Sequence, residues 1–208
     1  MRLWSVRPPR GERTFTLFTV LGILAMVRKL LLAALVAVTG SFAIAAELKS
    51  GPQSGEKLPG PFHPLNVNGS DAGQKTCLYC KNGDNPVAMV FARTNDEGTQ
   101  KLIAKLEEVT AANSKCEMGS FVVFLSDDDK IGDELKKVAE KAKLKNVVLS
   151  IDTPAGPNKY NVAKDADITV VLYTERKVVV NHSFAKGKIT DADIETIAKD
   201  VSKITPKK

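Results

Sequence analysis

Two alternating hydrophobic patterns occupy the second half of the chain. Apolar runs of six to eight residues predict buried strands, whereas apolar positions spaced three or four residues apart predict amphipathic helices. The two patterns follow one another in the order strand, helix, strand, helix, strand. The strands are expected at 86–93, 120–126 and 146–151, and the helices at 99–113 and 129–144.

The chain ends in a predicted hairpin and a last helix. Strands at 168–173 and 177–184 flank a turn, and a loop at 153–167 precedes them. Thr190 is the expected N-cap of the helix, with Asp193 as its capping-box partner. Short apolar strands joined by helices indicate parallel pairing, and the hairpin adds antiparallel edge strands. The pattern therefore predicts an α/β fold with one central mixed sheet flanked by helices.

The segment before these elements differs in composition. Residues 47–74 are rich in glycine and proline, which favours an extended arm with irregular loops over a helix. Val67 lies in a short run that is suited to an edge strand. We divide the chain into a leader at 1–46, the arm at 47–74 and a single core domain at 75–208.

Residues 26–46 have the three parts of a secretory signal peptide. A short basic stretch begins at Met26, an apolar core follows at 30–38, and small residues then allow cleavage after Ala45 or Ala46. We therefore expect an exported protein that keeps no membrane segment after cleavage. Export to the periplasm or the cell exterior would place its cysteines in an oxidising compartment.

A second apolar run, at 15–25, precedes the signal. Arg28 and Lys29 separate the two runs, and burying these charges in one membrane span would cost several kcal/mol. We interpret Met26 as the functional start and residues 1–25 as an over-extended gene prediction. The alternative is an uncleaved anchor that includes both runs.

Charge and motifs exclude several classes of function. Of the formal net charge of +6, the leader carries +5, which leaves a nearly neutral body. A neutral body with few aromatic residues does not fit nucleic-acid binding. The sequence has no glycine-rich phosphate loop, no Ser-His-Asp order and no His-Glu-x-x-His motif, so no cofactor or metal is expected.

Cys77 and Cys80 form a Cys-x-x-Cys motif in the loop before the first core strand. Three interpretations are open: a structural or resting disulfide, a working redox pair, or part of a metal site. A disulfide across two intervening residues closes a small loop and stabilises little through chain entropy, which favours redox use over stapling. His63 and His182 have no characteristic zinc-ligand spacing relative to the pair.

Three segments resemble peroxiredoxins and related redoxins of the thioredoxin-like superfamily. Residues 55–62 resemble the opening segment of these proteins, 66–69 their short first hairpin, and 86–91 their first core strand. The resemblance covers roughly 51–204 and implies a thioredoxin-like fold. It also implies thiol chemistry with a protein thiol or disulfide partner.

The sequence departs from the redoxin pattern at the expected active site. In redoxins the reactive cysteine follows the first core strand, at the N-terminus of the next helix. Here that place is held by 94–98, which contains no cysteine, and Ile168 stands where a cis-proline is expected. Two functions remain: thiol–disulfide exchange, in which Cys77 attacks and Cys80 resolves, or a redox-inactive binding or structural module.

Cys116 is the odd cysteine of the chain. We expect it to be a free or half-buried thiol, with a disulfide joining Cys77 to Cys80. The alternative is that helix geometry brings all three thiols together in a relay or a metal site. Among the other polar residues, His182 is expected to face solvent from an edge strand, and 127–129 to lead into a helix, where carboxylates suit the positive end of the dipole.

Overall fold

The computed structural model describes residues 48–206 of the chain. The expected signal peptide, its cleavage sites and the proposed start at Met26 lie outside these residues. None of the helices between residues 48 and 206 is long and apolar enough to cross a bilayer.

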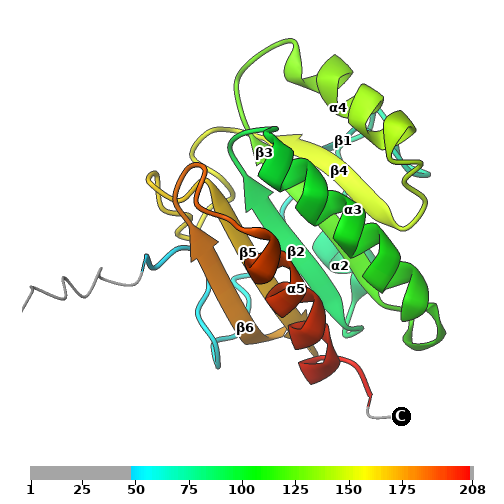
Figure 1. Cartoon of the computed structure of the whole chain (residues 1–208), viewed down its shortest axis with the longest axis vertical. Helices are drawn as coiled ribbons and strands as arrows, with labels where there is room; N and C mark the ends of the chain where they lie inside the picture. The colour runs from blue at the N-terminus through cyan, green and yellow to red at the C-terminus, as the bar shows by residue number, and fades with distance from the viewer. Residues whose placement is uncertain (1–47, 207–208) are drawn as a thin grey trace, which may run out of the picture. The chain divides into compact units, whose positions relative to one another are not determined.

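One six-stranded mixed sheet forms the centre of this domain (Figure 1). The strand order is β1-β4-β3-β2-β5-β6, with β2, β3 and β4 parallel and the other neighbours antiparallel. The strands are β1 (Leu65–Asn66), β2 (Val87–Ala92), β3 (Gly119–Leu125), β4 (Val147–Asp152), β5 (Ile168–Thr174) and β6 (Lys177–Phe184).

Helices α3 (Glu97–Ala112), α4 (Ile131–Lys141) and α5 (Asp191–Asp200) cover one face of the sheet. Both right-handed crossovers, β2–α3–β3 and β3–α4–β4, place their helix on this face. The capping box of α5 is present as predicted, with the Thr190 hydroxyl accepting from the Asp193 backbone N–H. Figure 1 shows α3 and α5 side by side in front of β2 and β5.

Among residues 48–206, no long helix lies on the opposite face. That face is covered by the arm, the loop at 153–167 and the short helix α2 (Leu78–Asn82), with Leu58, Phe62 and Tyr160 buried among them. Strand β2 separates the two layers, because Ala88, Val90 and Ala92 face α3 whereas alternate residues face the arm. The arm is therefore an integral layer of the hydrophobic core.

Most predicted elements agree with the structure to within two residues. The expectation that the Cys pair lies in a loop is wrong, because this segment folds as helix α2. Residues 127–129 lead into α4 as predicted, but the helix begins two residues later than expected. That helix begins at Ile131, and its N-cap Lys130 makes no side-chain cap. Its first-turn carboxylates are instead Asp133 and Glu134.

Candidate functional site

Cys77 and Cys80 are joined by a disulfide at the start of α2. Cys77 is the N-cap of this helix, and its Sγ accepts a hydrogen bond of 3.1 Å from the Cys80 backbone N–H. Cys80 is exposed to solvent and Cys77 is half-buried. The disulfide can therefore be reached from outside, while one of its sulfurs faces a backbone donor.

Buried side chains hold α2 against the sheet. Leu78 and Tyr79, between the two cysteines, enter the apolar layer and are 2% and 8% exposed. At the end of the helix, the Asn82 side-chain amide donates to the Leu78 carbonyl oxygen at 2.8 Å. Asn82 also lies against Gly119 of β3, where there is room only because glycine has no Cβ. The helix is fixed at both ends although it has only five residues.

The loop that enters Cys77 is anchored by Asn66 of β1. The backbone of Asn66 pairs with Gly73 and Gln74, and its side-chain Nδ2 donates to Thr76 Oγ1 at 2.5 Å. Thr76 is the residue directly before Cys77. Asn66 is 2% exposed, so this anchor lies inside the domain.

The tip of the β5–β6 hairpin contacts α2 from the other side. The guanidinium carbon of Arg176 lies 5.1 Å from the centroid of the Tyr79 ring, which is a cation–π distance. Arg176 Nε is also 3.1 Å from Asp84 Oδ1, and the Glu175 backbone N–H donates to the Asp84 carbonyl oxygen. The segment from Tyr79 to Asp84 is thus bound to the hairpin tip at two points.

Aromatic residues fill the layer beneath the Cys pair. Phe62 and Phe91 pack edge to face on Tyr160 with ring centroids 5.0 and 5.7 Å away. Burial raises the pKa of Tyr160 and of Tyr173 well above the usual range, so both phenols stay neutral. The Tyr160 hydroxyl donates to the Gly60 carbonyl oxygen, whereas the Tyr173 hydroxyl has no partner among the described residues.

Cys116 lies on the opposite side of the sheet from Cys77. It is half-buried against the layer that contains α3 and α5, and its Sγ is 3.1 Å from the Asn113 carbonyl oxygen. Cys77 packs in the other layer, with α2 and the arm. The structure confirms the expected pairing of Cys77 with Cys80 and leaves Cys116 free. Within residues 48–206, no three cysteine, histidine or acidic side chains gather to form a metal site.

The redoxin active-site position lies at the other end of β2 and holds no sulfur. Thr94 Oγ1 donates to Asp167 Oδ2 at 2.7 Å and so links the segment after β2 to the residue directly before β5. The Arg93 guanidinium fills the space next to it by donating to the carbonyl oxygens of Pro154, Ala163 and Ala166. The described chain contains no cis peptide bond there or elsewhere.

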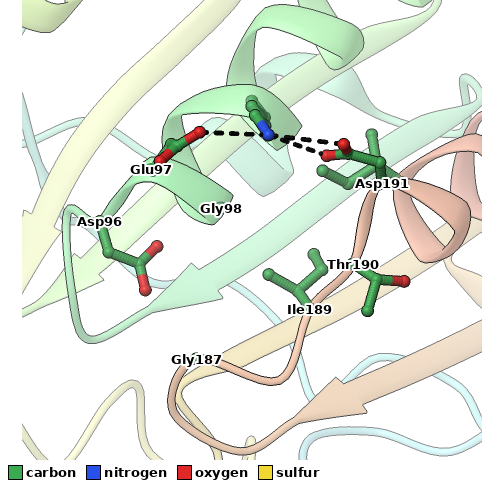
Figure 2. A pocket seen from close by; sticks show the side chains of 9 residues that line it. Asp96, Glu97, Gly98, Gly187, Ile189, Thr190 and Asp191 are labelled. Carbon is green, nitrogen blue, oxygen red and sulfur yellow. Dashed lines mark hydrogen bonds and ion pairs between the residues drawn. The ribbon is translucent and has the colours of Figure 1, made fainter.

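A surface pocket adjoins this segment. Figure 2 shows it between the N-terminus of α3 and the loop into α5, with the carboxylates of Asp96, Glu97 and Asp191 at its rim. Lys101 forms ion pairs with Glu97 and Asp191 across it, at 3.2 and 3.1 Å. The pocket is lined by three carboxylates and one ammonium, and no cysteine is among its lining residues.

His182 corrects another expectation. Its Nε2 lies 2.9 Å from Asp200 Oδ2, and its side chain is 25% exposed. The β6 strand places His182 under the end of α5, so the residue does not face solvent freely. Neither His182 nor the exposed His63 belongs to a metal cluster in the described part of the chain.

Comparison with solved structures supports the fold. A protein described as a disulfide isomerase, from Bacteroides thetaiotaomicron, matches with a TM-score of 0.57 and 15% identity over 76% of this chain and 94% of that one. The chain has a thioredoxin-like fold. A protein described as a thiol:disulfide interchange protein DsbE, from Chlorobium tepidum, matches with a TM-score of 0.54 and 18% identity, over 76% of this chain and 99% of the other.

Peroxidases share the same thioredoxin-like fold. The thiol peroxidase from Chromobacterium violaceum matches with a TM-score of 0.55 and 13% identity over 76% of this chain and 90% of that protein. Identities at this level establish the fold alone. No protein-family model and no curated protein matches the chain.

Proposed function

We propose that this protein exchanges thiols and disulfides with protein partners through Cys77 and Cys80. The observation that carries the proposal is the hydrogen bond from the Cys80 N–H to Cys77 Sγ in a solvent-accessible disulfide. In the reduced protein this N–H would stabilise a thiolate on Cys77, and thiolates are the species that attack disulfides. The likeness to proteins described as disulfide isomerase and DsbE supports the same chemistry.

The exchange has two balanced steps. The Cys77 thiolate attacks one sulfur of the partner's disulfide, forms a mixed disulfide and releases the other partner sulfur as a thiolate, which takes a proton from water. The Cys80 thiol then loses its proton to water and attacks Cys77 Sγ. This step forms the Cys77–Cys80 disulfide and releases the second partner thiolate. Two electrons have then passed from the protein to its partner.

A redox-inactive binding or structural module is the second candidate. It is favoured by the hydrogen bond of Thr94 with Asp167, which occupies the position where redoxins hold their reactive thiol. In that case the disulfide would be a permanent bond. The reduction potential separates the two functions, because structural disulfides have potentials below about −300 mV and working pairs have higher ones.

The test is equilibration of the protein in glutathione buffers of graded potential, with the thiols then counted by alkylation and mass spectrometry. We expect a midpoint above about −300 mV. The Cys80→Ser variant should accumulate a mixed disulfide with a model substrate through Cys77, and Cys116→Ser should behave like the native protein. A midpoint far below that value, together with a failure to reduce insulin disulfides in a turbidity assay, would establish that the protein is a redox-inactive module.

We also propose that the mature protein acts after export. The basic start, apolar core and small residues of segment 26–46 support this, and a stable disulfide suits an oxidising compartment. N-terminal sequencing of the protein from the exporting compartment should find Glu47 or Ala46 as the first residue. A mature chain that begins before Met26 would show that the segment is retained.

A further inference from the structure

The turn between β5 and β6 keeps two non-glycine residues in an unfavourable backbone conformation. Glu175 and Arg176 have φ angles of 51° and 59°, in the left-handed region. Asparagine and glycine are preferred in such hairpin turns, and other residues cost about 1–2 kcal/mol each. Arginine at position 176 therefore costs stability relative to glycine, and contacts of its side chain can offset that cost.

Those contacts converge on the Cys-x-x-Cys segment. The guanidinium of Arg176 stacks on Tyr79, which directly precedes Cys80, and Nε pairs with Asp84, which follows the end of α2. The Arg176 carbonyl oxygen accepts from the Leu58 N–H, so the arm holds the turn from behind. The side chain of Arg176 thus joins the residues on both sides of Cys80 to a fixed point of the sheet.

The charge of Arg176 lies over the ring of Tyr79, the residue directly before Cys80, and Asp84 screens it only partly. Its side chain is 48% exposed, and its partner Asp84 is 73% exposed, so water weakens their ion pair. Lys81, on the other side of the helix, is bound to Asp71 at 2.8 Å. Reduction of the disulfide creates a thiolate, and a nearby cation stabilises that negative charge.

We propose that Arg176 is a positioning residue that raises the reduction potential of the Cys77–Cys80 pair. It does so in two ways. It holds α2 in the conformation in which the Cys80 N–H points at Cys77 Sγ, and it places a positive charge over Tyr79, the chain neighbour of Cys80. At the working pH the half-reaction adds two electrons and one proton to the disulfide, yielding one thiolate and one thiol.

This inference rests on the proposed exchange chemistry, but its test does not require turnover. Protein purified from cells that express the full chain is equilibrated in glutathione buffers, and the equilibrium constant for its reduction is measured. For Arg176→Ala we expect a constant about tenfold lower, equivalent to a potential about 30 mV more negative. Arg176→Lys should recover part of the loss, because it keeps the charge without the planar stack.

Lys177→Ala is the matched control, since it removes a neighbouring charge from the same hairpin. The Lys177 side chain forms no ion pair or hydrogen bond in the described part of the chain, so the constant should stay within about threefold of native. Thiolate absorbance gives the second readout, with the Cys77 pKa expected to rise in Arg176→Ala. Circular dichroism confirms that each variant is folded.

Tyr79→Leu keeps the potential measurable if Arg176→Ala fails to fold. It retains an apolar side chain, removes the ring under the guanidinium and should shift the constant in the same direction. An unchanged constant in the folded Arg176 and Tyr79 variants, or an equal loss in Lys177→Ala, overturns the inference. These outcomes depend only on the difference between each variant and the native protein. The proposed function is decided separately, by the value of the native potential.

Discussion

Gly119 is the residue that allows α2 to lie against β3. A Cβ at this position would overlap with Asn82 Oδ1, and Asn82 is held in place by its hydrogen bond to the Leu78 carbonyl oxygen. The Cys-x-x-Cys helix and the first residue of a core strand are therefore in direct backbone-to-side-chain contact.

Gly119→Ala is expected to destabilise the protein by about 1–3 kcal/mol, because Asn82 must leave its position. Chemical denaturation measures the loss. Gly132→Ala in α4 is the control, since its Cβ would meet only the Ile151 side chain at an ordinary 3.7 Å, and alanine favours a helix. Adding Asn82→Ala to Gly119→Ala should recover part of the loss, and full additivity of the two changes would contradict the proposed clash.

Glu107 stabilises the loop between α4 and β4. Burial raises its pKa, but hydrogen bonds from the backbone N–H groups of 145–147 and from the Asn146 side chain outweigh burial and hold the pKa below its ordinary 4.5. The stabilisation is therefore present above pH 4.5 and is lost as the pH falls through the lower, folded-state pKa.

Glu107→Gln should cost about 1 kcal/mol of unfolding free energy at neutral pH, because the charge-assisted hydrogen bonds become neutral. Urea denaturation at a series of pH values measures the difference from the native protein, which should shrink as Glu107 becomes protonated. Glu108→Gln, on the exposed neighbouring residue, should change little at any pH. A difference that grows on acidification would refute this role.

At the scale of elements, the pattern predicted the helices and strands that are long enough to show a hydrophobic period. Strand β2 is buried along its whole length and helix α3 spans four turns, so each leaves a clear periodic signal. Helix α2 has five residues, too few to show a period, and it depends on tertiary contacts with Gly119 and Arg176. Contacts between residues distant in the chain leave no local pattern.

The candidate site divides in the same way. The sequence alone identified Cys77 and Cys80 as the candidate pair, and it showed that residues 94–98 contain no cysteine. It could not identify Arg176, because most of the domain's sequence separates this residue from Tyr79, which it contacts. It also left Cys116 ambiguous, because helix length alone says which end of the sheet a residue reaches and not which face. The alternation of β2 side chains between the two layers resolves that ambiguity.

Reduction of the disulfide is expected to loosen α2 and leave the sheet intact. A loop closed over so few residues contributes about 2 kcal/mol or less in the chain-entropy account, while the core strands are held by two apolar layers. Hydrogen exchange of the reduced protein should show faster amides only in and around 78–82. Unfolding of β2 or β3 on reduction would show that the disulfide is a structural staple.

At the scale of the whole molecule, the usual redoxin site and the Cys pair lie at opposite ends of the sheet. Strand β2 runs from Val87, near the pair, to Ala92, near Thr94. Six strand residues span roughly 17–20 Å, so neither position can assist the other directly. The likeness to peroxidases therefore extends to the fold and not to a shared reactive centre.

Peroxide consumption with a thiol reductant should remain at background. A peroxidatic thiol needs an activated site after the first core strand, and that position here holds the Thr94–Asp167 hydrogen bond. Coupled consumption of hydrogen peroxide, followed over time beside a peroxiredoxin standard, provides the measurement. Robust turnover that Cys77→Ser abolishes would instead place peroxidase chemistry on α2.

The placement of the disulfide also determines the direction from which a partner can approach. A reductase that docks on the N-terminus of α3, as it would on a redoxin, meets Thr94, Asp167 and no sulfur. A partner that serves the Cys pair must instead fit a surface made by α2, the arm and the hairpin tip. The exchange proposed here therefore requires a partner whose docking surface differs from one that fits the usual redoxin site.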